Sequence, residues 1–183
     1  MISSDYPNVS DLIADAKASF EKALELLERE DYYDAAEKAW RAIEAMRKAV
    51  LVAAKIPYQY AKTVNIGLPL FSDFLRNINK KRVLDLYDKL AYRLHILGFY
   101  EGITSFEEIR ELIISDVKIL LRELEQIVKI AEKVDLREAL ESFLRIQKLK
   151  RKIMIHHAEL IDAKTQYLDK LSLSIAKVFG NRE

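Results

Sequence analysis

The chain has 183 residues, of which 50% are hydrophobic, and its 30 basic and 29 acidic side chains leave a net charge of +1. This length fits one domain with a hydrophobic core, and the balanced charge excludes the strongly basic composition typical of many nucleic-acid-binding domains. No cysteine is present, which excludes disulfide bonds and thiolate metal sites. Only four glycines and three prolines interrupt a sequence rich in strong helix formers, so we expect few and long helices.

The composition also bears on where the protein works. A chain without cysteine suits the reducing cytoplasm, and abundant charge with few Asn, Gln and Met residues is typical of thermophilic proteins. The first residues, MISSDYPNVSD, lack the basic start and the apolar stretch of a signal peptide. No uncharged apolar run approaches the roughly 18 to 20 residues that span a bilayer, so we expect no membrane partner.

The charges are unevenly distributed along the chain. Residues 1–30 hold seven acids against three bases, whereas residues 145–183 hold nine bases against four acids. This polarity can serve a partner surface, or it can simply reflect solvated helix faces.

The first two predicted helices occupy residues 9–30, with Asn8 or Ser10 as a cap, and residues 31–55. The second helix carries apolar residues at helical spacing, and most of them are small: Ala35, Ala39, Ala42, Met46, Ala49 and Ala53. Small side chains let a neighbouring helix come close. Residues 56–67, IPYQYAKTVNIG, are predicted to form the longest loop.

The middle of the chain predicts a short helix over residues 68–78 and a longer one over residues 79–97, for which Asn79 is a plausible cap. Two glycines at positions 98 and 102 then indicate a tight connection. The next helix is predicted over residues 105–134, because S-F-E-E at its start has the form of a capping box.

After Asp135 the helical pattern resumes and continues to Val178, which predicts one long C-terminal helix. Its apolar face extends over about forty residues, roughly 60 Å at 1.5 Å per residue. A small bundle cannot cover this face, so we expect part of it to pack on another chain and the protein to be a homodimer. The predicted fold is an all-α antiparallel bundle of five or six helices over residues 1–134, followed by the long helix within residues 135–183.

Few stretches carry a recognisable chemical motif. The sequence has no phosphate-binding glycine loop, no HExxH and no GxSxG. With three histidines and no cysteine, we predict neither a metal site nor a cofactor.

Two basic stretches can meet phosphate groups. The C-terminal stretch, our candidate nucleic-acid-binding cluster, consists of Lys148, Lys150, Arg151 and Lys152. The other lies between residues 76 and 93, where six bases face two acids. Neither stretch has the interleaved aromatics of a single-strand binder, so solvated faces are the alternative.

Arg151 also lies five residues before His156 and six before His157, the spacing of the arginine–histidine motif of HEPN-type ribonucleases. On a continuous helix, however, Arg151 and His156 point about 140° apart. The alternative is that both histidines lie at an interface.

Residues 92–102, YRLHILGFYEG, raise the question of a catalytic corner. Leu94 and Leu97 lie on the core stripe of their helix, His95 lies at its boundary, and Arg93 lies on the opposite flank. A boundary histidine with an ordinary pKa near 6.5 can act as a general acid or base. It can equally bond a neighbouring carbonyl and take no part in chemistry.

Two stretches together resemble the archaeal PaREP-type helical family. They are DYYDAAEKAWRAIEAMRKAVLVAAK and LAYRLHILGFYEGITSFEEIRELIISDVKILLRELEQI, which contains the more specific Leu-His and Phe-Tyr-Glu corner. That family is similar in pattern to the HEPN superfamily of helical bundles. The resemblance implies a dimeric bundle that is either a metal-independent ribonuclease of a toxin–antitoxin system or a non-catalytic partner or nucleotide-binding module.

The resemblance also points to particular residues. His95 and Tyr100 match the histidine and the aromatic of the ribonuclease site, but Arg93 is too close to His95. Lys89 is the only base in the window where the arginine belongs, so His95, Lys89 and Tyr100 are the candidate catalytic residues.

The sequence thus leaves two main hypotheses for function. The first is a non-catalytic dimer that binds protein, nucleotide or nucleic acid, and the second is a metal-independent endoribonuclease. A scaffold without any ligand is a third. A neighbouring nucleotidyltransferase gene would point to a toxin–antitoxin pair, with that enzyme as the protein partner.

Overall fold

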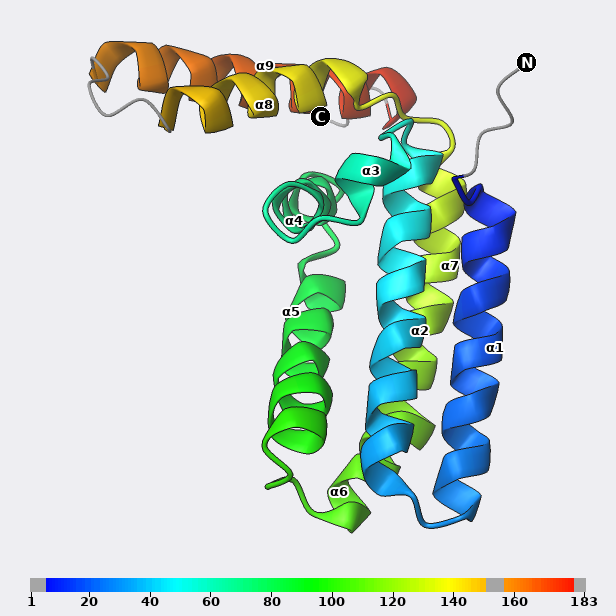
Figure 1. Ribbon diagram of the computed structural model, residues 1–183. Coiled ribbons are helices and arrows are strands. Elements are labelled where there is room, and N and C mark those ends of the chain that lie inside the picture. Colours follow the sequence, from blue (N-terminus) through cyan, green and yellow to red (C-terminus); the bar gives the residue numbers. More distant parts are fainter. Residues whose placement is uncertain (1–5, 151–156, 180–183) are drawn as a thin grey trace.

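The computed structural model describes residues 6–150 and 157–179, and it leaves the side chains of residues 149, 150 and 157–160 undescribed. All regular structure in the described residues is helical, which confirms the all-α prediction. The helices form a bundle with a helix pair across one end (Figure 1). Within residues 6–150 and 157–179, the structure contains no helix that could span a lipid bilayer.

Helices α1 (Val9–Glu28) and α2 (Tyr32–Ala53) begin and end close to the predicted positions. Asn8 caps α1 in a complete capping box with Asp11, and the Asp31 side chain caps α2. Helix α2 lies at the centre of the bundle, between α1, α7 and the segment after α5 (Figure 1). Its small side chains make this possible, because its alanines are buried and allow neighbouring helices to approach closely.

The predicted loop over residues 56–67 is partly helical. It contains the single-turn helix α3 (Tyr58–Ala61), and α4 (Gly67–Asn77) begins at its last residue. The predicted cap at Asn79 is wrong, because this residue has a φ of 58° and Lys80 occupies the N-cap position of the next helix.

The two helices predicted over residues 79–97 and 105–134 each contain a π-helical segment. Helix α5 (Lys81–Leu90) continues into η1 (Ala91–Tyr100). After a short connection, α6 (Phe106–Glu111), η2 (Leu112–Val117) and α7 (Lys118–Ala131) follow one another without a break. Hydrophobic periodicity does not separate α- from π-helix, so the sequence carries no clear signal for these segments.

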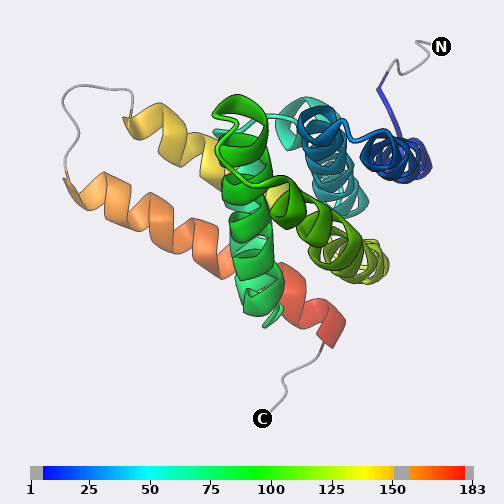
Figure 2. The ribbon, with the colours of Figure 1, turned by 90° about the horizontal axis from the view of Figure 1, so that it is seen from below.

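The predicted single long C-terminal helix is wrong. Helices α8 (Arg137–Lys150) and α9 (His157–Phe179) lie side by side and run in opposite directions (Figure 2). The rings of Phe143 and Tyr167 meet edge to face at 5.5 Å. Seven apolar residues of these two helices are already buried in the single chain, so no partner chain is needed to cover them: Leu140, Phe143, Ile146, Ala163, Tyr167, Leu171 and Ile175.

The helix pair is attached to the bundle at the end opposite α6 (Figure 1). The Tyr167 hydroxyl donates to an Asp73 carboxylate oxygen of α4 at 2.6 Å, and the Leu136 amide donates to the Ala54 carbonyl at 2.9 Å. The division into residues 1–134 and 135–183 stays a prediction, with a helix pair in place of the single helix.

Candidate functional site

The candidate corner is built on the π-helix η1. Its backbone hydrogen bonds join residues five positions apart, whereas those of an α-helix join residues four positions apart. The sequence predicted that the helix ends before Gly98. The structure shows instead that Gly98 lies within η1. A Cβ atom at Gly98 would lie 3.1 Å from the Arg93 carbonyl oxygen and 3.5 Å from the Ala36 Cβ, so this glycine lets η1 pack closely on α2. The turn itself uses Gly102, with a φ of 64°. Segments of π-helix are rare and often occur at functional sites.

His95 is partly buried and packs against two aromatic rings. Its imidazole stacks on the Trp40 indole of α2, with ring centroids 5.3 Å apart. It meets the Tyr100 ring edge to face, with ring centroids 4.9 Å apart. Its Nδ1 atom is buried and has no hydrogen-bond partner in the described residues. Burial lowers the pKa of His95 below its usual 6.5 and outweighs the attraction of Glu44 and Glu37 for the charged ring. His95 is thus a neutral, stacked side chain at neutral pH.

This lowered pKa makes a testable contribution to pH-dependent stability. The unfolded chain binds the His95 proton more readily than the folded chain, so the free energy of unfolding falls as the pH drops below about 6.5. In an NMR titration we expect the pKa of His95 to lie below 6.5, with the resonance assigned by its loss in His95→Phe. The stability of His95→Phe should fall less between pH 7.5 and 5.5 than that of the wild type. Equal losses would contradict this prediction.

A largely buried charged cluster, which the sequence did not predict and in which the Glu44 side chain is 20% exposed, lies next to these rings. Arg47 is 1% exposed and binds the Glu44 carboxylate through Nε at 2.7 Å and through a terminal nitrogen at 3.0 Å. Its other terminal nitrogen donates to the Ala61 carbonyl at 2.9 Å. The Tyr87 hydroxyl donates to the same carboxylate at 2.7 Å, and its ring lies 5.3 Å from Trp40.

Glu44 and Arg47 stay charged because the hydrogen bonds within the cluster stabilise their ionised forms. Burial acts to raise the pKa of Glu44, but hydrogen bonds and charge attraction from Arg47, with a further bond from Tyr87, hold that pKa below its usual value. Burial together with the Glu44 charge raises the pKa of the Tyr87 hydroxyl, so it stays a donor. An Arg three residues after a Glu within an alanine-rich helix was the only sequence signal for this cluster.

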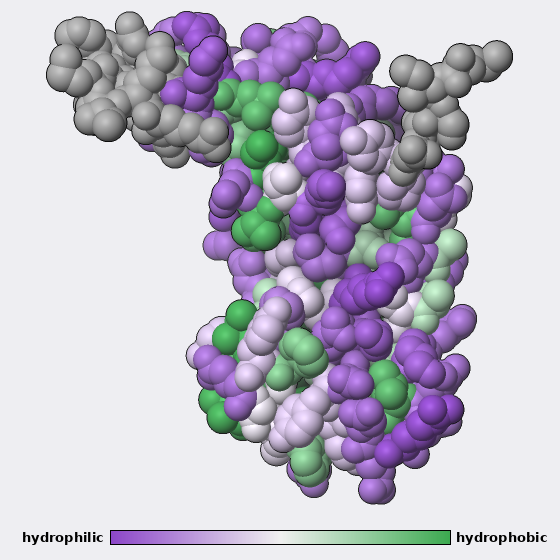
Figure 3. Space-filling view, viewed as in Figure 1, coloured by the Kyte–Doolittle hydropathy of each residue, from purple (hydrophilic) through white to green (hydrophobic). Residues whose placement is uncertain are grey.

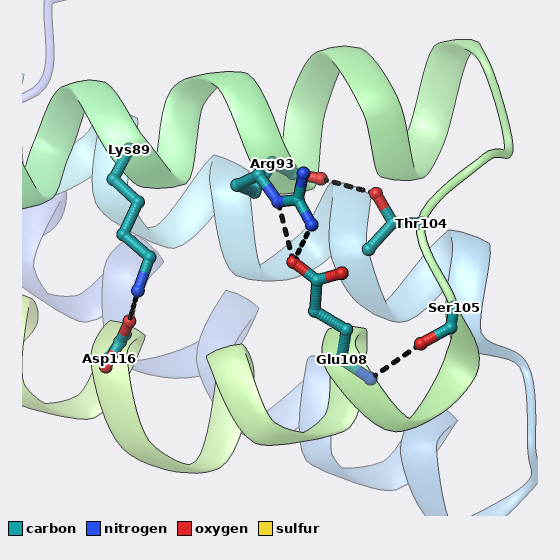
Figure 4. A network of polar contacts seen from close by, with 6 residues as sticks. All are labelled: Lys89, Arg93, Thr104, Ser105, Glu108 and Asp116. Carbon is teal, nitrogen blue, oxygen red and sulfur yellow. Dashed lines mark hydrogen bonds and ion pairs between the residues drawn. The ribbon is translucent and has the colours of Figure 1, made fainter.

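The other candidate bases point away from His95. Lys89 pairs with Asp116 of η2 at 2.6 Å, and the Arg93 guanidinium binds the Glu108 carboxylate of α6 (Figure 4). Glu108 therefore does not complete the predicted capping box, although its amide does donate to the Ser105 hydroxyl at 3.2 Å. The structure brings His95 and Tyr100 together and leaves Lys89 on another side of the helix. Their catalytic roles stay predictions.

Most bases of the stretch between residues 76 and 93 are neutralised by carboxylates. Besides Lys89 and Arg93, Arg76 pairs with Asp73 and Lys80 pairs with Glu123, each at 3.2 Å. In the described part of the chain, the two other bases of this stretch, Lys81 and Arg82, have no ion pair.

The C-terminal basic cluster is only partly described. Lys148 is exposed near the end of α8. The side chain of Lys150 and the whole of Arg151, Lys152 and His156 lie outside the described residues, as does the side chain of His157. Nucleic-acid binding by this cluster stays a prediction. Among the described residues, no group of His, Asp and Glu is arranged to hold a metal ion.

The end of the bundle beside His95 is strongly acidic. We call residues 28–37 and 101–111 the acidic end; they contain nine acidic and two basic side chains. The two segments are in contact, because the rings of Tyr32 and Phe106 stack at 4.7 Å and the Tyr33 hydroxyl reaches the Gly102 carbonyl. Apolar side chains are interspersed among the hydrophilic ones at this end, the lower one in Figure 3.

Comparison with protein families identifies the chain. Residues 11–121, which include η1, the acidic end and the Glu44–Arg47 pair, match the model of the archaeal PaREP1/PaREP8 family. The chain belongs to this family. No curated protein and no solved structure matches it. The helix pair α8–α9 lies outside the part matched by the PaREP1/PaREP8 model.

Proposed function

We propose that this PaREP1/PaREP8 protein is a non-catalytic protein-interaction module that uses its acidic end. The supporting observation is that the acidic end holds nine acids and two bases, and only Glu37 and Glu108 among these acids are paired with bases outside it, Lys38 and Arg93, in the described residues. RNA carries a negative charge on every phosphate, and a surface of this sign repels it. A protein segment with basic or apolar side chains meets no such barrier.

The arrangement of the cations supports the same proposal. Catalysis of RNA cleavage requires donors that stabilise negative charge developing on the phosphate. Lys89 and Arg93 are the nearest candidates in the sequence, and each is bound to a carboxylate of its own. The ring of His95 meets Trp40 and Tyr100 instead of a cation.

The second candidate is a metal-independent ribonuclease. One observation favours it: burial keeps the His95 imidazole neutral, and the ring contacts the exposed side chain of Tyr100, so a candidate general base adjoins the surface. In this case Tyr100, which is 68% exposed, would contact the substrate beside it.

An RNA cleavage assay in EDTA separates the two candidates. We expect no cleavage of single-stranded RNA by the wild type, and no difference from the variants His95→Ala and Tyr92→Ala. Tyr92 is an exposed residue of the same helix and provides the matched control. Cleavage that persists in Tyr92→Ala and is lost in His95→Ala would refute the proposed function and establish the ribonuclease.

A further inference from the structure

We propose that the acidic end docks on a basic flank of a second copy of the chain, which deepens the proposed function and rests on it. The basic flank comprises Lys81 and Arg82 at the start of α5 and Lys118 and Arg122 on α7. These four side chains are exposed and have no ion pair within the described residues. Two oppositely charged surfaces on one chain are complementary in a pair of copies.

The flank has an unpaired positive charge because the acids of η2 and α7 beside it are already bound to lysines. On α5, Asp85 and Asp88 are exposed and have no ion pair in the described residues. Asp116 pairs with Lys89 at 2.6 Å, Glu123 pairs with Lys80 at 3.2 Å, and Glu125 pairs with Lys17 at 3.3 Å. The basic side chains of the flank therefore have no carboxylate partner in the described part of their own chain, and a second molecule can supply one.

The flank is also hollowed and apolar. A hollow of about 710 Å³ lies between α5 and α7. Its apolar lining residues are Val83, Leu86, Ile119 and Leu120, and its polar ones are Asn79, Lys80, Lys81, Arg82 and Glu123. Ile119 is 51% exposed, although it is a large aliphatic residue. A second hollow of about 230 Å³ lies on the other side of α7 and includes Phe20, Leu121 and both α7 cations.

The acidic end presents the matching features. Four large hydrophobic side chains protrude from it: Tyr33, Tyr100, Ile103 and Phe106 are 40%, 68%, 67% and 47% exposed. Around them, Glu101, Glu107 and Glu111 are exposed and have no ion pair in the described residues. Aromatic and aliphatic side chains can fill an apolar hollow while these carboxylates meet the cations at its edge.

The same features disfavour nucleic acid as the occupant of the flank. Single-stranded nucleic acids bind cationic grooves that also offer exposed aromatic rings for base stacking. The large exposed hydrophobic residues of η2 and α7 are Ile114 and Ile119, which are aliphatic. The exposed aromatic rings Tyr33, Tyr100 and Phe106 belong to the acidic end instead.

In a closed dimer, the acidic end and the basic flank of each chain are both in contact with the other chain. If two copies lie antiparallel, the acidic end of each can rest on the flank of the other, which gives two identical contacts related by a twofold axis. We expect a particle of twice 21.3 kDa by sedimentation at low salt, with dissociation as the salt concentration rises.

A charge-exchange experiment tests this arrangement. The end variant carries Glu101→Lys and Glu111→Lys, and the flank variant carries Lys81→Glu and Arg82→Glu. Each variant alone places like charges together, so we expect its dimer dissociation constant to rise at least tenfold. An equimolar mixture of the two variants, and a single chain that carries all four changes, should recover the dimer.

Matched controls are available on the helix pair at the other end of the bundle. Glu138→Lys with Glu141→Lys, and Lys170→Glu with Lys177→Glu, change the same charges on α8 and α9 and should leave the dimer intact. Circular dichroism of each variant checks that it is folded before its dissociation constant is compared.

Two outcomes overturn the second-copy proposal. They are a monomer at 100 µM and low salt, and a dimer whose dissociation constant responds to the control changes and not to the end and flank changes. Neither outcome depends on RNA cleavage in EDTA, so the proposed function stands or falls separately.

Discussion

Replacement of Arg47 by alanine should destabilise the fold by about 3–5 kcal/mol, the usual cost of removing one partner from a buried ion pair. The guanidinium is almost fully buried, and its loss leaves the Glu44 carboxylate with only the Tyr87 hydroxyl and the Ala61 carbonyl without its donor. Urea denaturation followed by circular dichroism measures the loss. A change below about 1 kcal/mol would show that the cluster is solvated.

A double variant separates the cost of an unpaired charge from the value of the pair. Glu44→Gln with Arg47→Met removes both charges and keeps similar volumes, and replacement of a buried pair by groups of this kind is often close to neutral. We expect the double variant to be more stable than Arg47→Ala. As a surface control, Arg41→Ala breaks an exposed pair with Asp15 and should cost less than about 1 kcal/mol.

The same cluster should contribute to acid sensitivity. The pKa of Glu44 is lower in the folded chain than its ordinary value of 4.5, so its stabilising contribution is complete above that pH and is lost as the pH falls through the folded pKa. The free energy of unfolding of Glu44→Gln should therefore fall less steeply below pH 4.5 than that of the wild type. Parallel slopes would contradict this assignment.

Replacement of Gly67 by alanine is the second change with a large expected effect, roughly 2–3 kcal/mol or more of lost stability. The added Cβ atom would lie 2.2 Å from the Ala61 carbonyl oxygen and 2.9 Å from a terminal nitrogen of Arg47. The backbone around α3 must then move, and the hydrogen bond between Arg47 and Ala61 cannot keep its geometry. Thermal and urea denaturation both report the loss.

Gly98→Ala provides the matched control for this clash. Its Cβ atom would meet the Arg93 carbonyl oxygen at 3.1 Å, which is tight but can be relieved by a shift of a few tenths of an ångström. We expect Gly98→Ala to cost less than Gly67→Ala. The reverse order would show that the close contact of η1 with α2 is more rigid than the loop around α3.

Part of the site could be predicted from the sequence, and the reasons differ among its residues. His95 and Tyr100 were recognised by resemblance to a helical family, and the structure shows them in contact. The ring that stacks on His95, Trp40, lies 55 residues earlier in the chain, and helical periodicity placed it only at the edge of the core. The ion pairs of Lys89 and Arg93 were not predicted, because they depend on how α5 and η1 align with the returning helix.

The sequence by itself determined the helical class, the extent of α1 and α2 and the central place of small side chains, because helix propensity, capping and apolar periodicity are local properties. Only the tertiary structure decided that the C-terminal helical pattern forms a pair, since a helix that folds back on its neighbour and one that packs on another chain have the same periodicity. It also decided that Arg47 is buried and that the charges separate into an acidic end and a basic flank. Such features depend on contacts between residues far apart in the sequence, such as Arg47 with Ala61 and Tyr87 with Glu44, and a local pattern does not determine these contacts.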